Sequence, residues 1–275
     1  MNGKVVVITG ATSGIGMVAA ERLAAMGARM VLVARDKTRG AAALGRIPGH
    51  GNTIYYADLS RIAEMKRVAA EIAAAEPRID VLINNAGALF NSRQVTADGL
   101  EMTFATNHVS YFVLTHGLRE RLAATPGARV VNTASDAHKG KKLDFSDLQA
   151  EKGYSGFSVY GRSKLCNILF TRELAHRLPQ GVTANCLHPG FVSTRFGDQS
   201  GGAFSMVVKI AKLFAISQAK GAETIVYLAS SPEVAGATGG YFYKCKLATP
   251  SPEAQDDASA KRLWTETERL TGITW

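Results

Sequence analysis

The amino-acid sequence predicts an α/β protein with a doubly wound parallel sheet of about seven strands and helices on both faces. Three observations predict this fold class. Short apolar runs rich in β-branched residues recur along the chain, segments with helical periodicity lie between them, and the two kinds of segment alternate throughout. Continuous apolar runs are typical of strands that are buried on both faces of a parallel sheet. One domain covering residues 1–275 therefore accounts for the chain.

The elements follow in chain order from the run "KVVVIT", which enters the sheet at residue 4. The predicted strands lie at 4–9, 29–34, 53–57, 81–84, 129–134, 182–187 and 240–243. The spacing of apolar residues predicts helices at about 15–26, 36–44, 61–75, 100–124, 159–178 and 252–270. No internal repeat, low-complexity tract or linker interrupts the alternation.

The composition argues against several classes of protein. The formal net charge is +9, but the basic residues are scattered and the densest group is "KGKK" at 139–142, so we expect no nucleic-acid partner. No apolar run reaches the roughly 18 residues that span a bilayer, so we expect no integral membrane segment and a cytoplasmic location. Cys166, Cys186 and Cys245 lack metal-ligand spacing and are expected to be reduced thiols, with no metal site.

The first predicted strand runs directly into the glycine-rich stretch "TGATSGIG" at 9–16 and then into a helix. Gly10, Gly14 and Gly16 allow a tight turn and a close approach of the backbone to a ligand. A helix N-terminus offers unpaired N–H groups to a pyrophosphate, so the stretch predicts a dinucleotide-binding loop. A simple strand-to-helix turn is the alternative that the glycine spacing alone leaves open.

The end of the second predicted strand indicates which dinucleotide binds. In such folds an acid there binds a free ribose 2′-hydroxyl, whereas an arginine accommodates a 2′-phosphate. Arg35 occupies this corner, with Lys37 and Arg39 close behind, which favours NADP(H) and leaves NAD(H) possible. Asp36 would reverse the preference if its side chain pointed inward, but we expect it to cap the next helix.

The stretch "VYGRSKLCN" at 159–167 sets Tyr160 and Lys164 four residues apart in a segment with helical spacing. Residues four apart are neighbours on a helix surface. An ammonium near a phenol favours the phenolate, so we expect Lys164 to lower the pKa of Tyr160 from about 10. The tyrosine would then exchange a proton with a substrate. The spacing alone leaves open an incidental pair on a solvated face.

Several motifs occur in a defined order along the chain. They are "TGATSGIG" at 9–16, "DL" at 58–59, "NNAG" at 84–87, Asn107, Ser135, "YGRSK" at 160–164 and "PG" at 189–190. In this order and spacing they resemble the short-chain dehydrogenase/reductase (SDR) superfamily, over essentially the whole chain. The stretches "SKLCNILFTRELAHRL", "NTASDAH" and "PSPEAQDDASAKRLWTETERL" are similar to the branch that holds retinol dehydrogenases and WW-domain-containing oxidoreductases. The resemblance implies a Rossmann fold and an oxidoreductase.

The resemblance also implies the catalytic residues. Tyr160 would donate the proton to the substrate oxygen in reduction, and Lys164 would lower its pKa and hold the nicotinamide ribose. Ser135 would hydrogen-bond the same oxygen, while Asn107 would hold a water that relays protons from solvent. Positioned donors are what the charge developing on that oxygen needs.

The cofactor contacts implied by the resemblance come from every loop at one end of the sheet. They are Gly10, Thr12, Ser13, Gly14, Ile15, Gly16, Arg35, Asp58, Leu59, Asn85, Ala86, Gly87, Tyr160, Lys164, Pro189, Val192 and Thr194. Asn84 is expected to be structural, and His108, His138 and His188 are expected to be ordinary loop residues, because the tyrosine fills the acid role. Met17 stands where retinol dehydrogenases often carry a lysine, which weakens the expected preference for NADP(H).

The predicted function is hydride transfer between NADP(H) and a small-molecule carbonyl or alcohol. An apolar segment at about 195–220 would form a substrate lid, which suggests a lipophilic substrate. Two alternatives are a C=C reductase resembling light-dependent protochlorophyllide reductase and a non-catalytic protein that senses NADP(H). The resemblance also implies a homodimer or homotetramer that pairs through the helices around 100–124 and 159–178.

Overall fold

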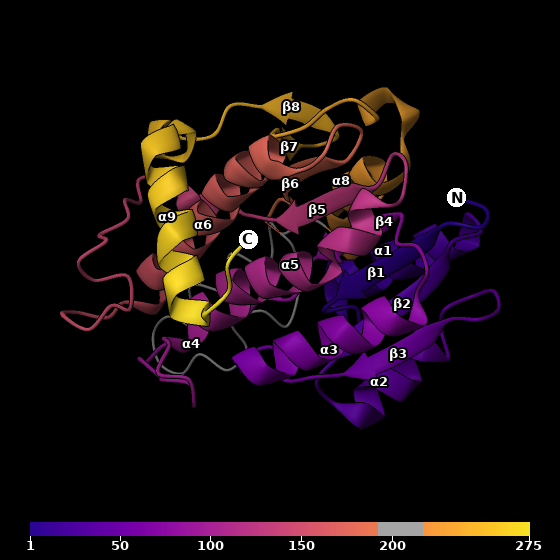
Figure 1. Cartoon of the computed structure of the whole chain (residues 1–275), viewed down its shortest axis with the longest axis horizontal. Coiled ribbons are helices and arrows are strands. Elements are labelled where there is room, and N and C mark those ends of the chain that lie inside the picture. The colour runs from indigo at the N-terminus through magenta and orange to yellow at the C-terminus, as the bar shows by residue number, and fades with distance from the viewer. Residues whose placement is uncertain (192–216) are drawn as a thin grey trace.

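A computed structural model describes residues 1–191 and 217–275 (Figure 1). The described strands form one sheet in the order β3-β2-β1-β4-β5-β6-β7-β8. Their bounds are β1 Val5–Thr9, β2 Arg29–Ala34, β3 Thr53–Tyr56, β4 Val81–Asn84, β5 Arg129–Thr133, β6 Thr183–His188, β7 Tyr241–Tyr243 and β8 Lys246–Ala248. The first seven strands run parallel, as predicted, and β8 pairs antiparallel with β7.

The eighth strand corrects the prediction of about seven. It returns from β7 through a two-residue turn in which Lys244 and Cys245 have φ of 49° and 58°. Positive φ at both central positions is the geometry of a tight hairpin turn. Lys and Cys are not the residue types, such as Asn-Gly, that predict such a turn from sequence. The strand itself is only three residues long, and Leu247 at its centre is 72% exposed. A short exposed strand has no buried face and therefore no apolar alternation in its sequence.

Helices cover both faces of the sheet (Figure 1). They are α1 Gly14–Ala25, α2 Lys37–Leu44, α3 Ile62–Ala75, α4 Met102–Phe104, α5 Ser110–Ala123, α6 Gly156–Arg177, α8 Gln218–Ser230 and α9 Asp257–Thr271. Helices α3, α5, α6 and α9 share one apolar cluster with the sheet, and α1, α2 and α8 share the other. The helix predicted at 100–124 is interrupted by a π-helical turn at Ala105–Val109, and the one predicted at 252–270 begins as a 3₁₀ turn at Pro252–Gln255.

Alternation along the buried strands builds the two core layers. In β1, Val5 and Val7 pack with the α3/α5/α6 layer, whereas Val6 and Ile8 pack with the α1/α8 layer. All four side chains are at most 6% exposed. Burying each such side chain contributes about 1.5–3 kcal/mol relative to leaving it in water. The continuous apolar run that predicted this strand is thus explained by burial on both faces.

The strand order fixes where a ligand can bind. From β1 the chain moves outward to β2 and β3, and it returns on the other side of β1 as β4. The chain after β1 leads to α1 in one layer of helices, and the chain after β4 leads to α5 in the other. Such a reversal of strand order favours a ligand-binding crevice at the carboxyl ends of these strands. The predicted glycine loop and the "NNAG" stretch follow these two strands.

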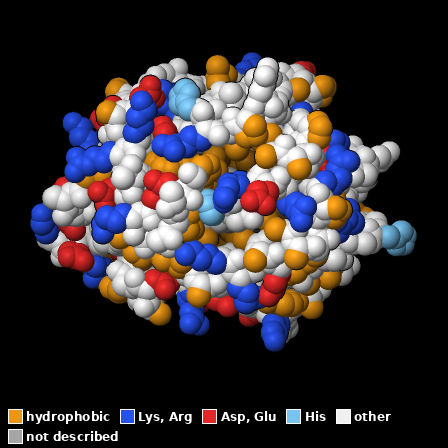
Figure 2. Space-filling model, viewed as in Figure 1, with side chains coloured by type: hydrophobic (Ala, Val, Ile, Leu, Met, Phe, Trp, Pro, Cys, Tyr) orange, Lys and Arg blue, Asp and Glu red, His pale blue; other side chains and the backbone are white. Residues whose placement is uncertain are grey.

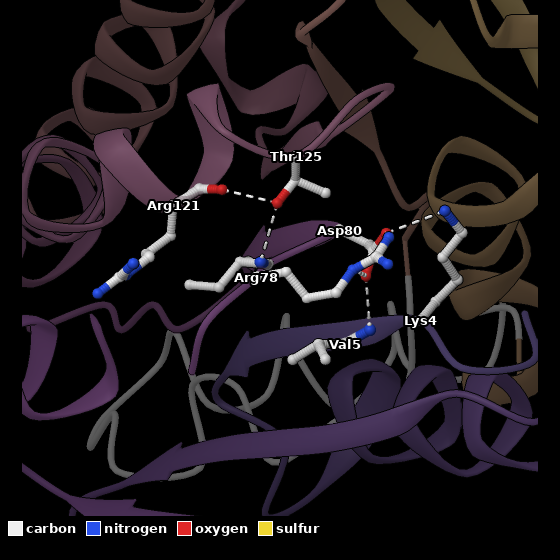
Figure 3. Close-up of polar contacts among 7 residues, drawn as sticks. Lys4, Val5, Arg78, Asp80, Arg121 and Thr125 are labelled. Atoms are coloured by element: carbon white, nitrogen blue, oxygen red, sulfur yellow. Dashed lines mark hydrogen bonds and ion pairs between the residues drawn. The ribbon is translucent and has the colours of Figure 1, made fainter. Parts of the chain in front are cut away.

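At the amino ends of the strands, opposite the crevice, a buried carboxylate holds β1 and β4 together. Asp80, just before β4, is 3% exposed and accepts hydrogen bonds from the Val5 N–H at 2.9 Å and the Lys4 ammonium at 2.9 Å (Figure 3). The Arg78 guanidinium also donates to it. Burial alone would raise the pKa of Asp80, but these three donors outweigh burial and lower it.

We expect Asp80→Asn to destabilise the fold in a pH-dependent way. A carboxyl whose pKa is lower in the folded than in the unfolded chain stabilises the fold above its unfolded pKa of about 3.9 and loses that effect as pH falls. Because Lys4 and Arg78 are about half exposed, the loss at pH 7 should be modest, about 1–3 kcal/mol in the free energy of unfolding.

Urea denaturation at pH 7 and at pH 3.5 would measure this difference. Exposed Glu120→Gln on α5 removes one negative charge without touching a buried contact and serves as the control. A loss of stability in Asp80→Asn that is equal at both pH values would contradict the ionic role of the carboxylate.

Charged side chains are mixed over the surface. Figure 2 shows Lys and Arg side chains spread over the face that it draws, with Asp and Glu side chains between them. Within the described part of the chain, no helix combines the length and the apolar character needed to cross a membrane.

Candidate active site

The glycine loop is joined to the loop after β4 by a compact set of hydrogen bonds. Thr9, the last residue of β1, accepts from the Asn85 and Ala86 N–H groups through its hydroxyl, both at 3.0 Å. The Asn85 side chain in turn donates to the carbonyls of Thr9 and Gly10. Gly10 has φ of +70°, and a Cβ there would lie 2.8 Å from the Ala86 Cα. The loop therefore needs glycine for both conformation and space.

The predicted lysine connects to the same loops. Lys164 lies on α6, is 3% exposed, and donates from Nζ to the Thr133 carbonyl at 3.0 Å. The Thr133 hydroxyl donates to Asn85 Oδ1 at 3.3 Å. A continuous chain of contacts thus runs from the lysine on α6, across the end of β5, to the glycine loop. The predicted residues Lys164, Asn85 and Gly10 meet at one edge of the sheet.

Tyr160 and Lys164 are neighbours on one helix, as their spacing predicts. Lys164 Nζ lies 5.5 Å from the centre of the Tyr160 ring and 5.9 Å from the centre of the Tyr111 ring. Tyr111 donates from its hydroxyl to the Ala86 carbonyl at 3.0 Å, so it also supports the loop after β4. The ammonium thus lies between two phenol rings, which stabilise a cation through their π faces.

The pKa values differ from the prediction. Burial raises the pKa of Tyr160 to about 12, against a side-chain hydrogen bond with Ser135 that lowers it. Burial also lowers the pKa of Lys164 to about 7. The expected lowering of the tyrosine pKa by the lysine is therefore wrong for this structure, because the loss of water around the buried phenol dominates and raises its pKa. The phenol is protonated at neutral pH, the state that a proton donor requires.

Ser135 lies two residues beyond β5, at the start of a 3₁₀ turn over Asp136–His138. Its hydroxyl oxygen accepts from the Ala137 N–H at 3.2 Å. Behind the turn, the buried His138 ring contacts the Ser135 carbonyl through Nδ1 at 2.6 Å and accepts from the Ser251 N–H through Nε2 at 3.1 Å. Since Nε2 accepts, the proton is on Nδ1. His138 is thus a buried support of the serine turn and not an ordinary loop residue.

His188 is likewise no loop residue, because it ends β6. Its Nδ1 accepts from the Asp136 N–H at 3.2 Å, and Tyr241 donates from its hydroxyl to the Asp136 carboxylate at 2.7 Å. The turn that carries Ser135 is therefore held from β6 and β7 as well. Both contacts serve the structure of this turn.

Asn107 lies in the π-helical turn and faces the loop after β4. It is fully buried, and its Oδ1 accepts from the Ala88 N–H at 2.7 Å. Its Nδ2 donates to the Ala88 carbonyl at 2.9 Å and to Ser163 Oγ at 3.0 Å. Both amide hydrogens are thus used. π-Helical turns within helices are frequent at functional sites, because the extra residue redirects the side chains that follow.

The predicted adenosine side of the site shows basic residues at the surface. Arg35 is exposed directly after β2, and the Asp36 carboxylate accepts from the Arg39 N–H at 2.8 Å, which caps α2 as predicted. A cavity of about 320 Å³ opens beside the glycine loop. Its lining residues are Thr12, Ser13, Gly14, Met17, Val18, Arg39, Ala42, Ala43, Arg46 and Gln218.

The remaining predicted cofactor contacts are only partly described. Asp58 accepts from both the N–H and the hydroxyl of Ser60, which fixes the turn after β3, and Leu59 is buried. Pro189 follows β6 at the same edge of the sheet. Val192 and Thr194 lie outside the described residues, as does the predicted lid at about 195–220 except for its last residues, which begin α8.

The family model described as short chain dehydrogenase matches residues 4–203. The chain belongs to the short-chain dehydrogenase family. The resemblance seen in the sequence is thereby confirmed, and this short-chain dehydrogenase is an oxidoreductase of the retinol dehydrogenase-like branch. Human retinol dehydrogenase 14 is 38% identical over 99% of the chain and 88% of its own length. The WW domain-containing oxidoreductase of Pongo abelii is 38% identical over 98% of the chain and 68% of its own length.

Solved structures agree with this short-chain dehydrogenase in fold. An uncharacterised protein from Mycobacterium paratuberculosis superposes with a TM-score of 0.80 at 31% identity, covering 99% of this chain and 94% of its own. A short chain dehydrogenase from Escherichia coli CFT073, solved in complex with NADPH, gives a TM-score of 0.71 at 22% identity. It covers 89% of this chain and 97% of its own.

Three contributors to the site of this short-chain dehydrogenase were not predicted. Thr9 and Tyr111 hold the loop after β4, and Thr133 links Lys164 to that loop. A signal existed for Tyr111, which lies four residues after Asn107 and therefore on the same helix face. Thr9 and Thr133 are the last residues of their strands, where parallel strands deliver side chains to the crevice.

Proposed function

We propose that this short-chain dehydrogenase transfers hydride between NADP(H) and a lipophilic carbonyl or alcohol, with Tyr160 as the proton donor. The observation that carries the proposal is the meeting of Tyr160, Lys164 and Ser135 beside the glycine loop. Lys164 Nζ lies 5.5 Å from the centre of the tyrosine ring, and a side-chain hydrogen bond with Ser135 acts to lower the pKa of the tyrosine.

The residues of the crevice suit a dinucleotide. Glycine at position 10 lets the first loop pack directly on Ala86 of the loop after β4, and the N-terminus of α1 offers N–H groups to a pyrophosphate. Asn85, Ala86 and Gly87 would line the nicotinamide side, and Asp58 and Leu59 the adenine. When bound, the cofactor supplies or accepts the hydride.

The chemistry of the protein side concerns the substrate oxygen. During reduction this oxygen gains negative charge, so it needs donors already in position. The Ser135 hydroxyl would hold the oxygen, and the Tyr160 phenol would transfer its proton to it and become the phenolate. The Lys164 ammonium would stabilise that phenolate. Because burial lowers the pKa of Lys164 to about 7, both forms of the lysine are accessible near neutral pH, which suits a group that passes protons on.

The preference for NADP(H) rests on the basic side chains near the glycine loop. Arg39 and Arg46 line the cavity there, Arg35 follows β2, and the Asp36 carboxylate is used as a helix cap. We expect Arg35→Ala combined with Arg39→Ala to raise the KM for NADPH by about 10- to 100-fold, because a charge-assisted hydrogen bond is worth about 1.5–3 kcal/mol. The KM for NADH should not change.

Initial rates with each cofactor would measure this selectivity. Exposed Arg269→Ala, on α9 and thus on the opposite layer of helices, is the matched control. A double variant that weakens NADPH and NADH equally would contradict the proposed 2′-phosphate contact.

The oligomeric state and the location belong to the same proposal. We propose a homodimer or homotetramer, but α9 packs on α6 within the chain, so the contact between subunits should not use the face of α6 that α9 covers. Light scattering coupled to size exclusion would give the mass. A cytoplasmic location is consistent with three free thiols.

The experiment that tests the function follows NADPH and NADH absorbance against a panel of aliphatic, aromatic, steroid and retinoid carbonyls. We expect NADPH oxidation with at least one lipophilic member and with no need for light. Absence of turnover with every carbonyl, despite NADPH binding, would overturn the proposal.

A further inference from the structure

The π-helical turn that carries Asn107 has a second anchor on its other side. His108, the next residue, is 1% exposed and lies between the rings of Phe104 at 5.2 Å and Phe170 at 6.0 Å between centroids. Its Nε2 lies 3.0 Å from the hydroxyl oxygen of Thr267 on α9. Residues 159 positions apart in the sequence thus meet beside the candidate active site.

The direction of this hydrogen bond follows from its surroundings. The Thr267 hydroxyl donates its one hydrogen to the Leu263 carbonyl at 2.7 Å. It must therefore accept from His108, so the imidazole carries its proton on Nε2. Burial lowers the pKa of His108 to about 3, so the ring is neutral across the physiological range, and the hydrogen bond to Thr267 sets its tautomer.

Asn107 and His108 connect the π-helical turn to different parts of the fold. Asn107 is bonded to both backbone groups of Ala88, on the cofactor side, whereas His108 is bonded to α9. A π-helical turn is a rare, single-turn departure from the α-helix, and unusual local conformations persist only where the surrounding structure holds them. Without the bond from His108 to Thr267, the backbone of this segment could return to α-helical hydrogen bonds. The turn would then contain one residue fewer, and Asn107 would rotate by about 100° away from Ala88.

We propose that His108 is a positioning residue, which acts through its hydrogen bond to Thr267 to keep Asn107 aimed at the loop after β4. The anchoring residue lies beyond residue 203, where the match to the family model ends. The C-terminal helix α9 would therefore help to position an active-site residue, besides packing on α6. Only the expected change in kcat rests on the proposed function; the structural role of His108 does not.

The test compares two threonines one turn apart on α9. Thr271 is 4% exposed and, like Thr267, donates its hydroxyl to the carbonyl four residues earlier, but its side chain bonds only within its own helix. Thr267→Val and Thr271→Val therefore cost the helix the same internal bond, and only the first breaks the contact with His108. Thr267→Ser keeps the hydroxyl and should behave like the parent protein.

Two readouts separate positioning from mere support. Hydrogen–deuterium exchange of the unliganded protein should show the Ala88 amide exchanging about tenfold faster in Thr267→Val than in Thr271→Val, because its acceptor Asn107 is loosened. With NADPH and an active carbonyl, kcat should fall about tenfold in Thr267→Val with the KM for NADPH unchanged. If Thr267→Val does not fold, Thr267→Cys replaces it, because a thiol is a weak acceptor.

Equal exchange at Ala88 in the two valine variants would overturn the inference, whatever happens to kcat. Failure of Thr267→Ser to restore the parent exchange rate would overturn it as well. If the parent protein turns over no carbonyl, the proposed function fails, while the exchange comparison still decides the role of His108.

Discussion

Tyr160→Phe is expected to lower kcat for carbonyl reduction by about 10²- to 10⁴-fold, the usual contribution of a positioned acid. The substitution removes one hydroxyl and leaves the ring beside the Lys164 ammonium. Because burial raises the pKa of Tyr160 to about 12, the phenol of the parent protein is protonated through neutral pH. Reduction should therefore be insensitive to this group near pH 7, whereas alcohol oxidation, which needs the phenolate, should speed up as pH rises.

Steady-state rates and a separate measurement of the Kd for NADPH would check this result. Tyr227→Phe removes a phenol on α8, in the opposite layer of helices, where the hydroxyl donates to Glu233. That control should retain full activity. Retention of parent activity by Tyr160→Phe, with NADPH bound normally, would show that another group donates the proton.

Lys164→Met is expected to lower activity strongly and yet stabilise the unliganded protein. Removing the buried ammonium leaves the phenolate without its cation, which should lower kcat/KM by about 10²-fold or more. Burial lowers the pKa of Lys164 to about 7, whereas in the unfolded chain it is about 10.4. Burying the charged form therefore costs stability in full below pH 7, and the cost fades as pH rises toward 10.

The variant should accordingly gain about 2–4 kcal/mol in the free energy of unfolding at pH 7, and this gain should vanish near pH 10. Methionine fills the space of the lysine stem, so no cavity offsets the gain. Urea denaturation across this range is the measurement, with exposed Lys142→Met as the control. A variant that is less stable than the parent at pH 7 would show that the bond to the Thr133 carbonyl outweighs the cost of burial.

Residues whose environment is local were predicted well. The apolar runs of β1, β2 and β4 specify strands because both faces of each are buried, and the sequence records this directly. The spacing of Tyr160 and Lys164 placed them together because both lie on one regular helix. Asp36 was predicted as a cap because capping depends only on the next three residues.

Features that depend on distant residues were not predicted. The apolar periodicity of 100–124 does not reveal the π-helical turn at Ala105–Val109, because one inserted residue leaves both flanking stripes intact. His108 and His138 find partners 159 and 113 positions away, so no local pattern marks them as buried supports. The pKa directions at Tyr160 and Lys164 depend on burial, which spacing alone cannot give.

Two buried histidines that support the candidate active site thus have hydrogen-bond partners near the C-terminus of the chain. His138, under the serine turn, receives the Ser251 N–H, and His108 reaches Thr267. A hybrid that transplanted only residues 4–203 into another scaffold would carry every motif of the family and still leave both imidazoles facing a foreign surface. Hybrids made to exchange substrate preference between relatives of this protein should therefore keep residues 4–203 together with the C-terminal segment of the same relative. Hybrids that transfer residues 4–203 alone should be less successful.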